Sequence, residues 1–357
     1  MDKSKTKLTL VSPPDSSPNN AAANSSGEFN NLNEQGGAQD DKASPDPQIV
    51  DPALELGLEE ENGPFEGVDF SENDLTKRDW KEVCFSHCNF ARAVLSDSSF
   101  TQCSFLACDF TGSLLSETVF SECRFEGVLF KDTCFSDGSL YANTFEGCHW
   151  EGTSLFKAII EDCFWSAGTA MVNVNLTSTA LINCQASELT LTDCALTLTM
   201  IENCQLIGLT LKQCSCVQAV AENLVVPGLK ASFCDFTKAT LAGANLDGAD
   251  LTGCNLSQAK LMGASLIDSC LRGAKAEQAI ITNASLMGAD LTGIKASMAD
   301  FSRSTLEGAS LELADLSQAN LHRTQGIPWD KSSINISGAR PTDPGLAKAE
   351  DFVPKRG

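Results

Sequence analysis

The stretch NCQASELTLTDCALTLTMIENCQLIGLTLKQC, residues 183 to 214, nearly repeats itself after twenty residues. When residues 183 to 194 are aligned with residues 203 to 214, seven of twelve positions match. A shift of ten residues gives almost no matches. The sequence therefore contains an internal repeat of twenty residues, and a repeat of this length is typical of a solenoid.

A shorter period of five residues runs through most of the chain. Between residues 65 and 165, every fifth position is Phe, Leu, Trp or Ile, without exception in twenty-one positions. After a shift of one residue within 166–172 the pattern continues over 176–321, where twenty-four of thirty positions carry Leu, Ile, Val or Phe. A second regular position precedes each large residue by two and is mostly Ala, Ser or Cys in 234–319. Both positions are predicted to point inward.

The segment LAGANLDGADLTGCNL, residues 241 to 256, resembles the A-(D/N)-L-x-x consensus of the pentapeptide-repeat family, and the resemblance covers roughly 260 of 357 residues. It implies an all-β fold, a right-handed quadrilateral parallel β-helix. Each pentapeptide forms one side, and four sides form a coil of twenty residues. Because neighbouring coils lie ~4.8 Å apart, about thirteen coils and a rod of ~60 Å are expected.

The interior is predicted to conserve volume along the rod. Where the small position carries a large residue, the large position shrinks, as in Leu224 before Val226 and Ile294 before Ala296. Ala276 and Ala296 lie twenty residues apart, so they are expected to stack and leave the core thin. The predicted weak point of the core is therefore at these two alanines.

Twelve of the sixteen cysteines fall at the small inward position. Because a free cysteine behaves as a small apolar residue, we predict that they are reduced and fill the core. Columns such as Cys194, Cys214 and Cys234 meet the Cα separation of a disulfide, so spacing alone leaves a disulfide open.

Catalytic and metal-binding groups are scarce. The chain has three histidines and one tyrosine, and it lacks a phosphate loop or a Ser-His-Asp set that could meet on these faces. The motif CFSHC, residues 84 to 88, suggests zinc, but Cys88 is expected to point inward while Cys84 and His87 point outward. We predict no enzyme activity, no cofactor and no metal.

The acidic side chains are concentrated in the first part of the repeats. The net charge is −22, and residues 62–165 carry seventeen acidic and seven basic side chains. Outward positions twenty residues apart form two acidic columns there, with neighbouring carboxylates expected ~5 Å apart. The candidate partner-binding residues are Asp97, Glu117 and Asp137 in the first column and Glu82, Glu122 and Asp162 in the second.

The acidic columns have two interpretations. One is that they keep a long β-rod soluble and prevent its association with other chains. The other is that they present a DNA-like run of negative charge to a basic protein. The family resemblance implies this second use, since the quinolone-resistance proteins of the family bind a type II topoisomerase. Direct nucleic-acid binding is not expected, because phosphate contacts need Lys and Arg.

The resemblance also implies a role in bacterial secretion. A Phe- and Cys-rich first half followed by a Leu-rich second half is similar to pentapeptide-repeat segments found with type VI secretion cargo. The function expected first is a non-catalytic interaction scaffold, either an adaptor for secretion-system cargo or a leaderless secreted effector. The alternative is an acidic DNA mimic. The partner would be a secretion component, a toxin cargo or a topoisomerase, and dimerisation through a rod end is a further option.

Composition divides the chain into six parts. Residues 1–50 are rich in Ser, Asn and Pro and are predicted to be a disordered tail. An Asp-Pro pair opens the predicted capping segments near both ends, and Trp329 is expected to plug the last coil. The remaining parts are an N-terminal capping helix (51–63), a Phe/Cys-rich β-helix (64–165), a phase slip (166–172), a Leu-rich β-helix (173–325) and a C-terminal loop and cap (326–357).

No apolar run is long enough for a membrane span or the core of a signal peptide. We therefore expect a soluble protein of the bacterial cytoplasm. Export without a cleaved signal peptide is the alternative.

Overall fold

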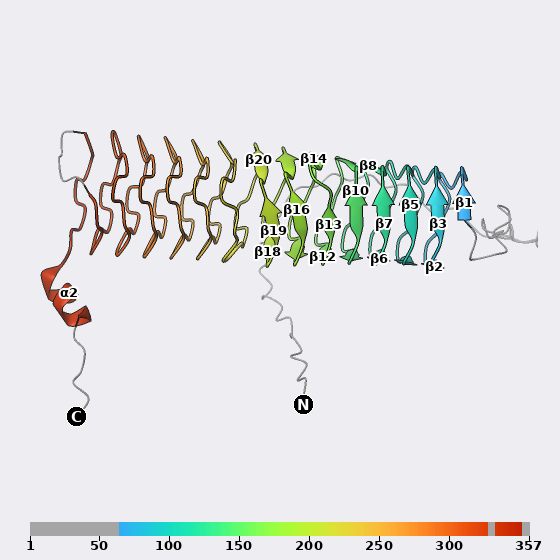
Figure 1. Ribbon diagram of the computed structural model, residues 1–357, viewed down its shortest axis with the longest axis horizontal. Coiled ribbons are helices and arrows are strands. Elements are labelled where there is room, and N and C mark those ends of the chain that lie inside the picture. The colour runs from blue at the N-terminus through green and yellow to red at the C-terminus, as the bar shows by residue number, and fades with distance from the viewer. Residues whose placement is uncertain (1–63, 328–332, 352–357) are drawn as a thin grey trace, which may run out of the picture. The chain divides into compact units, whose positions relative to one another are not determined.

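The computed structural model describes residues 64–327 and 333–351 (Figure 1). The expected tail, the N-terminal capping helix and Trp329 lie outside the described residues. Within them, short parallel strands wind into a β-helix, so the predicted fold class is confirmed.

Three of the four walls contain a parallel sheet, and the third wall consists of single bridges such as Asp74 with Val94. The first wall is β1 (Pro64–Glu66), β3 (Cys84–Ser86), β5 (Ser104–Leu106), β7 (Arg124–Glu126), β10 (Thr144–Glu146), β13 (Phe164–Trp165), β16 (Gln185–Ser187) and β19 (Gln205–Ile207). The second is β8 (Leu129–Lys131), β11 (His149–Glu151), β14 (Ala170–Val172), β17 (Thr190–Thr192) and β20 (Thr210–Lys212). The fourth is β2 (Asp79–Lys81), β4 (Ser99–Thr101), β6 (Val119–Ser121), β9 (Ser139–Tyr141), β12 (Ile159–Glu161), β15 (Ala180–Ile182) and β18 (Met200–Glu202).

Each strand pairs with the strand one coil further along the chain. Phe65 pairs with Phe85, which is the twenty-residue interval read from the sequence. The interval becomes twenty-one residues where Trp150 pairs with Met171, because the corner between β13 and β14 contains one additional residue. The large residues before and after this corner therefore still point into the core.

The strands end earlier than the periodic sequence does. The eight strands of the first wall span seven turns, whereas about thirteen coils were expected. Beyond Lys212, the end of β20, the twenty-residue register continues as isolated bridges as far as Arg340 (Figure 1). The expected number counted every set of four pentapeptides as one coil. The later coils keep the register through isolated bridges, and the strands are confined to the first part.

The corners between walls explain this change. In the strand-rich part the small inward residue donates a hydrogen bond to a carbonyl of the previous coil, as from Cys108 Sγ to Phe85 O (3.4 Å) and Thr153 Oγ1 to Phe130 O (2.6 Å). In the later part the small residue is usually Ala, whose own N–H closes a tight turn, as from Ala264 N to Leu261 O (3.1 Å). The inward thiols are therefore donors as well as core filler, a role that the sequence prediction missed.

We predict that Cys108→Ala lowers the free energy of unfolding by about 1 kcal/mol more than Cys108→Thr, because Thr keeps a donor for the Phe85 carbonyl. Urea unfolding of both variants checks this. Equal losses would contradict the donor role.

Aromatic side chains fill the first part of the core. Phe85, Phe105 and Phe125 stack along one wall, with ring centroids 5.0 Å and 4.9 Å apart and nearly parallel planes. Rings on adjacent walls meet edge to face, as do Phe105 and Phe110 at 5.6 Å. Both arrangements are favourable for aromatic pairs, so this part of the core is packed without interruption from coil to coil.

An apolar cavity of about 60 Å³ lies in the core of the later coils, between the levels of Leu181 and Leu251. The sequence prediction placed the weak point at Ala276 and Ala296 instead. Both of these are fully buried, as is Ile294, and neither alanine lines this cavity.

The cavity lies beside Ala221, whose side chain is too small to fill its position in the core. This residue occupies the large inward position, and the residues at that position in the adjacent coils are Ile201 and Leu241. Leu224 lies at the nearby small position and fills part of the missing volume. A residue of the size of Leu is thus absent from one level of the column.

We predict that Ala221→Val raises the free energy of unfolding by about 0.5–2 kcal/mol, because the added methyl groups fill existing space. The matched control is Ala296→Val, which overpacks the core beside Ile294 and is expected to destabilise. Urea unfolding measures both, and a loss of stability in Ala221→Val would contradict the cavity.

A short helix, α2 (Pro344–Glu350), follows the last coil (Figure 1). It begins at the Asp-Pro pair: Asp343 Oδ1 accepts hydrogen bonds from Gly345 N (2.7 Å) and Leu346 N (3.0 Å). The helix has no buried residue. Apolar packing therefore does not hold it in place.

Charged groups attach α2 to the corners between the fourth and first walls in the last coils. Glu350 contacts Arg303 Nη2 (2.5 Å), Arg323 Nε (2.9 Å) and His322 Nε2 (3.3 Å). Burial alone would raise the pKa of Glu350, but the hydrogen bonds and charges of Arg303 and His322 outweigh it and hold the pKa below its usual value. Arg323 also pairs with Asp351 (2.7 Å) and donates to the Ala347 carbonyl, so the ionised Glu350 contributes to the attachment together with these contacts.

We predict that α2 detaches as the pH falls below the ordinary glutamate pKa of about 4.3. A carboxylate with a lowered folded-state pKa stabilises the attachment above that value, and the stabilisation is lost as the pH falls through the folded-state pKa. Amide exchange at Ala347 and Lys348 follows the change. Glu350→Gln should weaken the attachment and speed exchange at these amides at neutral pH, and an exchange rate equal to that of the natural sequence would contradict the role of Glu350.

Candidate interaction surface

The residues of the first predicted acidic column lie at the corners between the third and fourth walls. Asp97, Glu117 and Asp137 are exposed and adopt φ of 60°, 59° and 57°. The backbone N–H of each donates to a carbonyl of the next coil, at 3.1, 3.0 and 2.9 Å. These bonds stack the corners, so the structure brings the three carboxylates into one row on successive coils.

The second column is less regular. Glu82, Glu122 and Asp162 are exposed at the corners between the fourth and first walls, with Gln102 and Ala142 between them. Gln102 Nε2 donates to Glu122 Oε2 at 2.8 Å. The carboxylates of this column are therefore two coils apart.

Together the two columns border a single wall. β2, β4, β6, β9 and β12 lie between them, and we call this surface, with its two rows of corner residues, the acidic wall. Asp79 and Glu161 also point outward on it. The sequence prediction omitted both, although their outward phase could have identified them.

Several acidic side chains on the first and second walls, and at the corner between the second and third walls, have basic partners. These pairs are Arg92 with Glu72, Arg124 with Glu126 (3.3 Å) and Glu146 (3.0 Å), and Lys131 with Glu151 (3.2 Å). Within the described ranges, the side chains of Asp97, Glu117 and Asp137 form no ion pair or hydrogen bond. The three carboxylates thus form no ion pair, and Lys77 and Lys157 lie at the equivalent corners one coil before and one coil after them.

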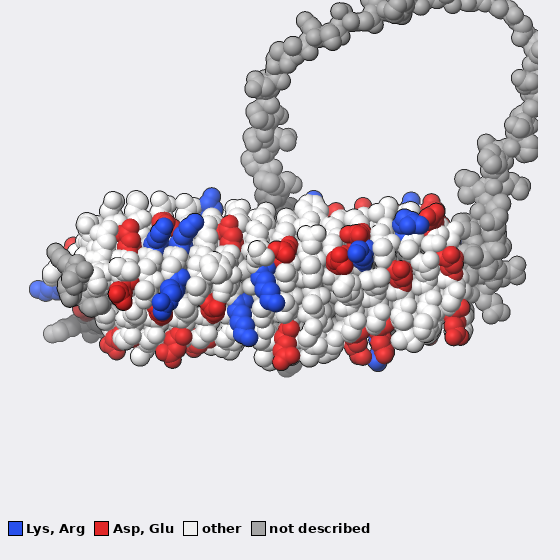
Figure 2. Space-filling model, turned by 90° about the horizontal axis from the view of Figure 1, so that it is seen from above, with Lys and Arg blue, Asp and Glu red and all other residues white. Residues whose placement is uncertain are grey.

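Charge is sparse over some of the surface. Figure 2 shows one face of the molecule on which acidic and basic side chains are separated by broad uncharged areas.

The described part of the chain contains no group of three or more His, Cys, Asp or Glu residues able to hold a metal ion. Cys88 is buried, whereas Cys84 is exposed and His87 lies at a corner. These residues do not converge. No helix among the described residues is long and apolar enough to cross a membrane.

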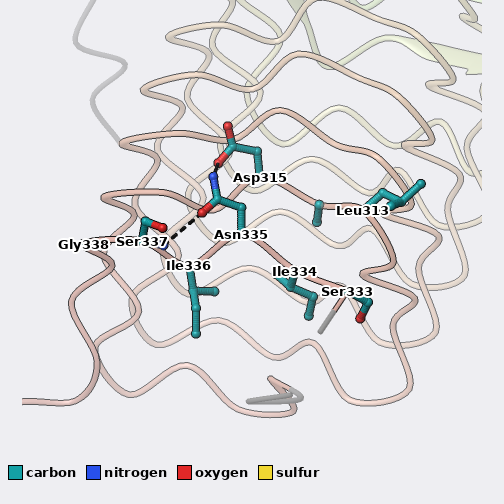
Figure 3. A pocket seen from close by; sticks show the side chains of 9 residues that line it. Leu313, Asp315, Ser333, Ile334, Asn335, Ile336, Ser337 and Gly338 are labelled. Carbon is teal, nitrogen blue, oxygen red and sulfur yellow. Dashed lines mark hydrogen bonds between the residues drawn. The ribbon is translucent and has the colours of Figure 1, made fainter. Parts of the chain in front are cut away.

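A hollow of about 650 Å³ lies at the last coil (Figure 3). Asn335 Nδ2 donates to Asp315 Oδ1 (2.9 Å), and Asn335 Oδ1 accepts from Ser337 N (3.2 Å). Apolar side chains, among them Leu313 and Ile334, line much of the remainder. Because the polar groups bind one another, they are not arranged as an acid-base pair for catalysis.

Comparisons with known proteins agree with this architecture. The model of the family "Pentapeptide repeats" matches eight copies, within residues 81–116, 108–142, 232–266, 269–308 and 297–325. No curated protein sequence matches the chain.

Three solved structures illustrate the similarity. Full-length QnrB1, a plasmid-mediated fluoroquinolone resistance protein, is 15% identical over 81% of this chain and 95% of its own, with a TM-score of 0.26. HetL from Nostoc sp. strain PCC 7120, a protein involved in the regulation of heterocyst differentiation, is 21% identical over 74% and 95%, with a TM-score of 0.27. A thylakoid-lumen protein from Arabidopsis thaliana is 27% identical over 27% and 59%, with a TM-score of 0.18.

Similarity at this level does not extend to function or partners. The repeat matches, together with the five-residue inward pattern and the twenty-residue strand register, settle the family. The chain is a pentapeptide-repeat protein.

Proposed function

We propose that this protein is a non-catalytic scaffold that uses the acidic wall to bind a basic surface of a partner protein. The observation that carries the proposal is the contrast in pairing. Several carboxylates elsewhere on the rod, and Glu82 on the acidic wall itself, have a basic partner. By contrast, among the described residues Asp97, Glu117 and Asp137 form no ion pair and are flanked by Lys77 and Lys157 only at the two ends of their row. A row of like charges is unfavourable by itself, and a complementary basic surface would relieve it.

The backbone makes this row suitable for recognition. Inter-coil hydrogen bonds fix each corner, so the carboxylates are presented ~4.8 Å apart on a rigid support. Little conformational entropy would be lost on binding. The matching family model also describes a structural repeat rather than a catalytic domain, which supports a non-catalytic role.

A protein that normally binds DNA is the partner class that we favour. A single DNA strand presents one phosphate every ~3.4 Å along its axis, and the corners of the rod present one carboxylate every ~4.8 Å, so both carry a regular run of negative charge. The two acidic rows border one wall, as two phosphate strands border a groove. A type II topoisomerase, implied by the family resemblance, is the specific candidate.

We predict that the purified protein inhibits DNA gyrase in a supercoiling assay at micromolar concentration. Replacing Asp97 and Asp137 by Asn and Glu117 by Gln should weaken this effect at least about tenfold, which corresponds to ~1.4 kcal/mol. Asn suits the left-handed corner conformation, so the fold should be retained.

The matched control removes three charges from the first and second walls: Glu126→Gln, Glu146→Gln and Glu151→Gln. It should leave the inhibition unchanged. The proposal of a topoisomerase partner fails if the natural sequence has no effect on gyrase, or if both triple variants lose the effect equally.

The adaptor role in secretion and dimerisation through a rod end stay hypotheses. The secretion role is supported only by the sequence resemblance to segments found with secretion cargo. Co-purification of a secretion component or a toxin from the native host would test it.

A further inference from the structure

Among the described residues, the ladder of backbone hydrogen bonds between coils has its longest interruption near residues 203–208, while single corner bonds are also absent at Gln213 and Gly308. Ile201 N donates to Val220 O at 2.8 Å. Immediately beyond this bond, and within the described part of the chain, no backbone hydrogen bond of normal geometry joins residues 203–208 to residues 222–227. Gln205 and Val225 keep their bridge register across the gap. The two coils are therefore joined by fewer hydrogen bonds here, although the twenty-residue register is unchanged.

A groove of about 710 Å³ opens at this position. Four apolar side chains at the groove are exposed to solvent, and two carboxylates accompany them. The apolar residues are Met200, Ile207, Val220 and Val225, and the carboxylates are those of Glu202 and Glu222. The groove thus combines an apolar lining with a negative rim.

The core cavity lies directly behind the groove. Ile201 and Leu224 line both spaces, so they form the partition between them. Ile201 is only partly buried, unlike most residues at the large inward position. A side chain entering from the groove would reach the space left by Ala221 if these two residues moved apart.

We propose that this groove binds a basic amphipathic peptide segment of a partner protein. One aliphatic side chain of the segment inserts between Ile201 and Leu224 into the cavity, and its Lys or Arg residues pair with Glu202 and Glu222. Charge complementarity selects this occupant, because the two carboxylates attract cations and oppose an anionic lipid or fatty acid. Burial of an aliphatic anchor in a dry, apolar pocket supplies the affinity. The site shares no residue with the acidic wall.

Two labelled peptides test the proposal: KKLLKKLLKKLL, and KKSSKKSSKKSS as the equally charged polar control. The first should bind in the micromolar range and the second at least about tenfold more weakly, a difference of ~1.4 kcal/mol. Ala221→Val fills the cavity and should weaken binding of the Leu peptide at least about tenfold. The Glu202→Gln, Glu222→Gln pair should weaken it comparably and reduce its salt dependence.

Two charge-matched controls should bind the Leu peptide normally: the Glu307→Gln, Glu312→Gln pair and the triple substitution of the acidic wall. Equal binding of the two peptides, or unchanged binding by Ala221→Val or by the Glu202, Glu222 pair, would overturn the proposal. Hydrogen exchange of the natural sequence gives a second readout that needs no variant. The Leu peptide should slow exchange at the amides of 203–208 and 222–227, and protection confined to the acidic wall would also overturn the proposal.

Discussion

The backbone hydrogen bonds between coils are the constraint on which the rest of the structure depends. Each coil pairs with the next at an interval of twenty residues, with one interval of twenty-one. This register stacks like on like: Phe85 over Phe105 in the core, and Glu117 over Asp137 at a corner. The same bonds therefore build the core and set the spacing of the charges on the surface.

Much of the fold follows from the five-residue period alone. Inward and outward positions could be assigned from the sequence because strand side chains alternate and every corner consumes the same number of residues. The donor role of residues such as Cys108 could not be assigned, because it depends on the geometry of the corner that precedes it. The cavity did leave a signal: Cys216 and Ala221 are consecutive small residues at the large position. Whether neighbouring side chains fill such a gap depends on packing that the sequence does not describe.

The candidate surface was predictable in part. The periodicity identified Asp97, Glu117 and Asp137 as outward, adjacent carboxylates. Because the two columns lie five residues apart, which is one side of a coil, the period also implies that they border one wall. The periodicity could not show which carboxylates have basic partners, because a long side chain such as that of Arg124 can reach acids on its own coil and on the next. The unpaired row is therefore a result of the three-dimensional structure.

Distances between spin labels along one corner test the coil geometry most directly. Labels introduced by unnatural amino acids at Gln102 and Asn183, four coils apart, should lie ~19 Å from each other, and labels at Gln102 and Asn283, nine coils apart, ~43 Å. The account predicts that the distance rises by ~4.8 Å with each further coil. Distances that level off with increasing separation in the sequence would contradict it.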